Sequence, residues 1–239
     1  MFLSRLELNP RSWRVRQDLE DCHALHARVM SGFGEVDPDD SARQAHGVLF
    51  EVVRVGGGRV LLVQSRTRPD WSKIPRGYLR GGEGAVGVEV VGLAGVLAAL
   101  RPAQVLPFRL CTNPCRKVKG RADEVGRSSG QRVPITGEAA RADWLARKGR
   151  EAGFELVNPE RLVQIEHGTL SASRPAAPDE PPITVSPVTF AGELRVVDPA
   201  ALVQAVQLGI GPSKAYGCGL LALAAYGGAF GVQLAACAG

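Results

Sequence analysis

The chain has 239 residues, a net charge of +5 and a sequence pI near 9.2, which is long enough for one large domain or two small ones. The basic excess favours an anionic partner, with nucleic acid ahead of a membrane. Aromatic residues make up only 5% of the chain, which argues against a surface built on extensive base stacking.

The first 112 residues contain four regular patterns in succession. Residues 1–8 alternate apolar and polar side chains, as in a strand, and residues 14–33 have helical spacing. Residues 46–67 contain two β-branched runs around three glycines, which predicts a hairpin, and residues 104–112 are typical of another strand. Residues 91–100 are compatible with either helix or strand. The order β-α-β-β-(α)-β is the ferredoxin-like pattern of many RNA-binding domains.

The predicted helix carries two histidines, His23 and His26, next to Cys22. Side chains three residues apart lie on one face of a helix, so the pair is compatible with metal binding, acid/base chemistry or packing. A zinc site would need further ligands, and His46 and His167 have no second ligand pair nearby in sequence. We therefore expect no metal.

A basic segment follows the first domain, and no acidic residue occurs between residues 101 and 122. Such a run can be a solvated surface or a track for RNA phosphates. Its candidate contacts, with two residues from the later β region, are Arg116, Lys117, Lys119, Arg121, Arg132, Arg161 and Gln164.

The second half repeats the α+β order less clearly. A helix is predicted over 136–154 with Thr136 as its cap, β-rich stretches over 155–173 and 183–198, and a helix over 199–209 with Pro199 in its first turn. A glycine-rich loop precedes a last strand, after which an uncharged tail extends to residue 239. The tail is either an apolar extension or a membrane anchor, and we expect the former because it contains many small residues and Gln233.

Five cysteines are present, and no pair has Cys-x-x-Cys spacing. A chain of this size does not need disulfides for stability, so we expect a reducing cytoplasm. The N-terminal segment is too short and too charged for a signal peptide.

The string GIGPSKAYGCGLLALA, residues 209–224, resembles the C-terminal signature of the CasE family, the type I-E CRISPR repeat-processing endoribonucleases of the RAMP superfamily. It is not a phosphate P-loop, because it lacks that spacing and ends a helix instead of beginning one. Other blocks resemble the family in the same order: MFLSRLEL, LEDCHALH, FRLCTNPCRKVKG, RVPITGEAARADWLARKG and PVTFAGELRVVDPAALVQAVQ.

The resemblance implies tandem ferredoxin-like domains and metal-independent cleavage of pre-crRNA at the base of the repeat hairpin. It also implies that the crRNA 3′ hairpin stays bound and that the protein is a subunit of Cascade, monomeric apart from that complex. We expect a first domain over 1–112, a basic linker over 113–131, a second domain over 132–225 and a tail over 226–239.

The resemblance further implies that His26 is the catalytic base, a role that suits an imidazole with a pKa near 6.5. His23 stands where many relatives have tyrosine, and it is a candidate general acid, substrate contact or packing residue. Ser31 stands where some relatives have lysine. We therefore expect Arg28, or a basic residue of the other domain, to stabilise the negative charge of the transition state. The alternative function is a RAMP-like scaffold that holds the hairpin without cutting it.

In the glycine loop, backbone amides freed of side chains can approach RNA closely, or the glycines can simply permit tight turns. The candidate RNA-binding residues in this loop are Gly209, Gly211, Lys214, Gly217 and Gly219.

Overall fold

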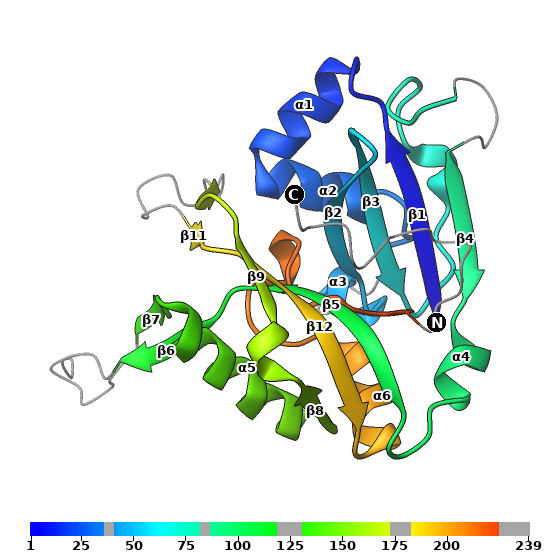
Figure 1. The fold of residues 1–239 in the computed structure, drawn as a ribbon. Coiled ribbons are helices and arrows are strands. Elements are labelled where there is room, and N and C mark those ends of the chain that lie inside the picture. Colours follow the sequence, from blue (N-terminus) through cyan, green and yellow to red (C-terminus); the bar gives the residue numbers. More distant parts are fainter. Residues whose placement is uncertain (36–40, 82–86, 119–130, 173–182, 225–239) are drawn as a thin grey trace, which may run out of the picture.

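The computed structural model describes residues 1–35, 41–81, 87–118, 131–172 and 183–224. Figure 1 shows two adjoining domains, each built on an antiparallel sheet with helices packed against it. The uncharged tail after residue 224 lies outside the described residues. No helix in the described part of the chain is long and apolar enough to cross a membrane.

The first domain has a four-stranded sheet in the order β2-β3-β1-β4, which is the ferredoxin-like order. Its elements are β1 (Phe2–Leu8), α1 (Trp13–Glu20), α2 (Cys22–Met30), α3 (Ala42–Ala45), β2 (Leu49–Val55), β3 (Gly58–Ser65), the 3-10 helix η1 (Trp71–Lys73), β4 (Val88–Gly92) and α4 (Ala94–Ala98).

The second domain repeats this order with β13-β5-β12-β8, and β9 also pairs with β12. The expectation of two tandem ferredoxin-like domains is therefore confirmed. Its elements are β5 (Val105–Thr112), β6 (Cys115–Val118), β7 (Gln131–Pro134), α5 (Glu138–Glu151), β8 (Phe154–Val157), η2 (Pro159–Arg161), β9 (Val163–Glu166), β10 (Leu170–Ala172), β11 (Ile183–Val185), β12 (Val188–Val196), α6 (Pro199–Leu208), η3 (Lys214–Tyr216) and β13 (Leu221–Leu223).

The strand expected to close the first domain belongs instead to the second. β4 closes the first sheet against β1, whereas β5 pairs with β12 and β13. Periodicity identifies a strand but not the sheet it joins, and β5 buries Phe108 and Leu110 in a cluster that includes the second domain's helices. The segment expected as a linker forms, in its described part, the β6–β7 hairpin.

The predicted first helix is also two helices, because the chain breaks at Asp21. The Asp21 backbone is extended, and its carboxylate accepts a hydrogen bond from the His23 amide at 2.8 Å, which caps α2. The expected cap at Thr136 is likewise wrong: α5 is capped by Gly137, without a side-chain hydrogen bond.

The two faces of the first sheet have different neighbours. One face packs under α1 and α2 around Phe50, and the other faces the second domain (Figure 1). Two buried polar contacts cross this boundary. Arg109 pairs with Glu51 at 2.7 Å, and the Gln64 side chain donates to the Val206 carbonyl at 2.6 Å. Burial raises the pKa of Glu51 and Arg109 opposes this, so the pair holds the domains in register at a desolvation cost.

Candidate active site and basic groove

The two histidines lie near the start of α2, where the Asp21 cap orients the first turn. His23 is exposed and His26 is partly buried, with its ring 6.4 Å from that of Phe50. Their spacing of three residues places them on one helix face. Nδ1 of His26 is buried and has no hydrogen-bond partner among the described residues.

The glycine-rich loop of the second domain approaches this face of α2. Its η3 turn packs against α2 (Figure 1), and the Ala215 backbone interacts with the His26 ring. Burial lowers the pKa of His26, His23 and Arg43 lower it further, and the Ala215 backbone opposes them. The imidazole is therefore neutral at neutral pH, the form that accepts a proton.

Arg43, which the sequence analysis did not single out, brings a cation to the site. It lies on α3, and its Nη1 donates to the Val48 carbonyl at 3.3 Å. Burial lowers the pKa of Lys214, and Arg43 and Lys148 lower it further, so the charge of Arg43 acts on both His26 and Lys214. No local pattern marks Arg43, because it lies seventeen positions beyond His26 on a separate four-residue helix.

Arg28, one candidate for the transition-state charge, is engaged elsewhere. Its Nε lies 2.9 Å from the buried Asp18 carboxylate, and its guanidinium stacks 5.2 Å from the Tyr78 ring centroid. Residues two apart on a helix do not share a face, so Arg28 points away from His26. Ser31 ends the helix by donating from its hydroxyl to the Arg28 carbonyl at 2.7 Å.

A groove of about 1190 Å³ leads away from the histidines across the second domain. Arg43 and Ala215, which both act on the His26 ring, form part of its wall, so the groove begins beside this histidine. The basic residues lining the groove are Arg43, Arg116, Lys117, Arg132, Arg147, Lys148 and Lys214.

Only two of these seven cations form ion pairs within the described residues. Arg147 and Lys148 both bind Glu151, at 2.7 and 2.6 Å, and Glu151 is the one acidic residue in the described groove lining. The other five keep a net positive charge facing the groove, which suits a polyanionic ligand.

The remaining sequence-predicted contacts do not line this groove. Gln164 donates to the Glu138 carbonyl at 2.9 Å, and Arg161 borders a separate hollow of about 250 Å³ near β8. Lys119 and Arg121 lie outside the described residues.

The glycines of the loop are closely packed. A side chain on Gly209 would approach Leu49 of the first domain at 2.8 Å, and one on Gly211 would overlap the Thr112 hydroxyl. Gly217 and Gly219 also have positive φ, at 77° and 92°. Tight packing therefore explains part of this sequence pattern, and the loop carries Lys214 to the groove.

The described residues contain no group of three or more His, Cys, Asp or Glu side chains placed to hold a metal ion. Cys22, His23 and His26 thus do not form the beginning of such a cluster within that part of the chain.

Comparison with known proteins places this geometry in a family. The family model described as "CRISPR associated protein" matches residues 1–225. The chain is 32% identical over 231 residues to the CRISPR-associated endoribonuclease Cse3 of Thermus thermophilus, covering 94% of this chain and 100% of that protein. It is 38% identical over 124 residues to the Cascade subunit CasE of Escherichia coli K12, covering 50% of this chain and 57% of that protein.

A solved structure of Thermus thermophilus Cse3, bound to an RNA that represents a pre-cleavage complex, superposes with a TM-score of 0.72 at 29% identity. The match covers 93% of this chain and 98% of that one. With the tandem ferredoxin-like domains and the histidine-bearing helix, these matches show that the chain belongs to the CasE (Cse3) family of type I-E CRISPR-associated proteins.

Proposed function

We propose that this chain is a cytoplasmic, metal-independent endoribonuclease that binds the stem-loop of CRISPR repeats and cuts pre-crRNA at the base of the hairpin. The observation that carries the proposal is the partly buried His26, whose pKa is lowered by burial, in contact with the Ala215 backbone at the wall of a basic groove. The similarity to a Cse3 described as an endoribonuclease supports it. After cleavage the chain keeps the crRNA 3′ hairpin as a subunit of Cascade, as the relationship to CasE suggests.

The reaction needs a base beside the 2′-OH of the nucleotide before the scissile phosphate. His26 accepts the 2′-OH proton, and the oxygen attacks phosphorus in line. The bond from phosphorus to the 5′-oxygen then breaks, leaving a 2′,3′-cyclic phosphate and a 5′-OH. His23, on the same helix face and exposed, donates the proton that the leaving 5′-oxygen takes up.

Negative charge builds on the phosphate oxygens during attack and must be met by nearby cations. Arg43 and Lys214 take this role in place of the lysine that some relatives carry at the position of Ser31. Arg28 does not, because Asp18 already binds its guanidinium. Arg116, Lys117 and Arg132 hold the phosphates of the stem along the groove.

The alternative function is a scaffold that binds the hairpin and does not cut it. It is favoured by His23 and Ser31, which stand where relatives carry tyrosine and lysine. The Ser31 hydroxyl is occupied by the Arg28 carbonyl and takes no part at the site. In this case the groove is retained and only chemistry is lost.

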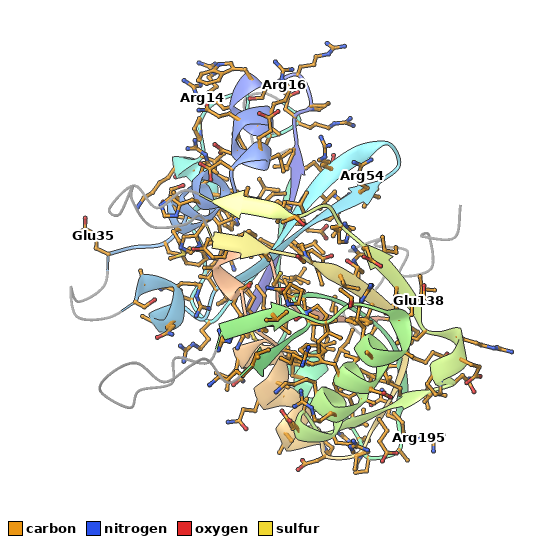
Figure 2. All side chains as sticks on the ribbon, turned by 90° about the vertical axis from the view of Figure 1, so that its left-hand side faces the viewer. Arg14, Arg16, Glu35, Arg54, Glu138 and Arg195 are labelled. Carbon is orange, nitrogen blue, oxygen red and sulfur yellow. The ribbon has the colours of Figure 1, made fainter. Side chains whose placement is uncertain are left out.

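Single-turnover cleavage of the cognate repeat separates the two. His26→Ala is expected to slow cleavage by about 10²–10⁴-fold, the usual contribution of a general base, with hairpin affinity unchanged. A slowing within about threefold, under roughly 0.7 kcal/mol, contradicts the assignment of the base. His23→Ala tests the acid, and the remote exposed Arg195→Ala (Figure 2) is the control. An unmodified chain that binds the hairpin without cutting it supports the scaffold.

A further inference from the structure

One end of the first domain exposes a tryptophan among arginines. Trp13, the first residue of α1, has 59% of its surface exposed, which is the largest exposure among the described large hydrophobic residues. Arg11, Arg14 and Arg16 are all exposed beside it in sequence. Neither the histidine site nor the basic groove uses these four residues, which we call the Trp13 patch.

The indole is already arranged as a stacking surface. The Arg14 guanidinium lies over the Trp13 ring, 5.0 Å from its centroid. Such cation–π pairs contribute about 0.5–1 kcal/mol at exposed sites, which favours one orientation of the ring. Base–aromatic stacking of this kind is how proteins bind single-stranded nucleic acid without reading its sequence.

Few acidic residues accompany the patch, and the first exposed one after it in sequence is Glu20, one helical turn beyond Arg16. No acidic residue occurs from residue 8 to residue 17, and the next one, Asp18, is buried against Arg28 at 2.9 Å. None of the three arginines of the patch forms an ion pair within the described part of the chain. A ligand with regularly spaced negative charges and flat rings complements both features.

The patch also lies where a strand leaving the active site can reach it. α1 packs against α2, and its eight residues span about 12 Å from Trp13 to the turn at which α2 and its histidines begin. In Figure 2, Arg14 and Arg16 lie at the end of the molecule remote from the second domain. The basic groove is lined mainly by residues of the second domain, and none of the four residues of the Trp13 patch is among them.

We propose that the Trp13 patch binds single-stranded RNA that continues from the repeat hairpin, with a base stacked on Trp13 and phosphates held by the arginines. The proposal rests on the proposed function, because it places the scissile phosphate at the histidines between the stem and this strand. RNA is favoured over an acidic protein because the substrate of such an enzyme necessarily extends beyond its hairpin.

Equilibrium binding tests the proposal with three RNAs that carry a 2′-deoxy nucleotide at the cleavage position: the hairpin alone, and the hairpin with a 5′ or a 3′ single-stranded extension. We expect one extension to strengthen binding, and Trp13→Ala to weaken binding of that RNA by about 5–150-fold, the cost of losing one stacked base. Affinity for the hairpin alone is expected to stay within about twofold. Trp13→Phe is expected to restore most of the loss.

Arg14→Ala with Arg16→Ala reports the phosphate contacts. For the extended RNA, the slope of log K against log salt is expected to fall by about 0.7 for each phosphate that the variant no longer neutralises. Arg150→Ala with Arg195→Ala, two exposed arginines away from the patch, is the matched control and is expected to leave the slope unchanged. The variants keep the fold because every substituted side chain is exposed.

The proposal is overturned if neither extension adds affinity, or if Trp13→Ala weakens all three RNAs equally. A Trp13→Ala loss seen only when other Cascade subunits are added, with RNA affinity unchanged, also overturns it and identifies a protein contact. Binding of the bare hairpin with no effect of extensions leaves the proposed function standing. Binding of an isolated single strand without hairpin binding supports the patch and contradicts the proposed function.

Discussion

Substitution of Gly211 tests whether the glycine loop serves packing or contacts RNA directly. Its φ is +88°, and a Cβ there would overlap the Thr112 hydroxyl and lie 3.2 Å from Trp144. In Gly211→Ala the left-handed backbone costs about 1–2 kcal/mol. The Thr112 hydroxyl, which donates to the Ile210 carbonyl at 3.0 Å, must also move, and leaving these buried groups unpaired costs about 1–3 kcal/mol. The free energy of unfolding should therefore fall by about 2–5 kcal/mol.

Gly137 is the matched control because it has the same φ of +88° with nothing within 4 Å of its Cβ position. Gly137→Ala should lose only the backbone contribution, about 1–3 kcal/mol, because a φ of 88° with a ψ of 136° is a conformation that side chains rarely adopt. Urea unfolding of both variants measures the difference, and hairpin affinity is measured below the unfolding transition, where both are folded. The reasoning is refuted if Gly211→Ala is as stable as Gly137→Ala but binds the hairpin much more weakly, since Gly211 then serves RNA and not packing.

Three further predictions concern the site and the domain boundary. Because burial, His23 and Arg43 lower the pKa of His26, the single-turnover rate should rise with pH along a limb centred below 6.5. Arg43→Gln should move that limb to higher pH, because the variant removes a positive charge near the imidazole. A limb that does not move would show that the charge of Arg43 does not influence the pKa of His26. Cleavage should persist in EDTA, whereas abolition restored by added metal would contradict the proposed mechanism. Arg109→Leu should lower the free energy of unfolding by about 3–5 kcal/mol, because it leaves the Glu51 carboxylate buried and unpaired. Urea unfolding measures this change. A decrease below about 1 kcal/mol would show that water reaches the carboxylate.

Short-range sequence patterns determine much of the secondary structure of this protein. Alternation in residues 1–8 and the glycine-flanked runs of 46–67 specify strands and a hairpin, because side-chain period and turn chemistry are local properties. The spacing of His23 and His26 likewise places both on one helix face. The sequence blocks shared with the family predict the fold and a histidine as the candidate base without any knowledge of contacts.

Other features depend on contacts between segments distant in sequence. The sequence predicts the wrong sheet for β5, because a strand's pairing partner depends on which core it completes, and its own period of two does not encode that choice. Arg28 is a candidate cation by sequence, but the buried Asp18 and Tyr78, neither of which its local pattern reveals as a partner, bind its guanidinium.

Only the tertiary structure brings Arg43 of α3 to His26 and, across the boundary between the two domains, the Ala215 backbone as well. It also decided the protonation of His26, since the pKa of an imidazole depends on the burial and charges around it. Sequence alone determines which side chains are available, and the tertiary structure decides which of them meet, because residues distant in the chain come together only through the packing of the two domains.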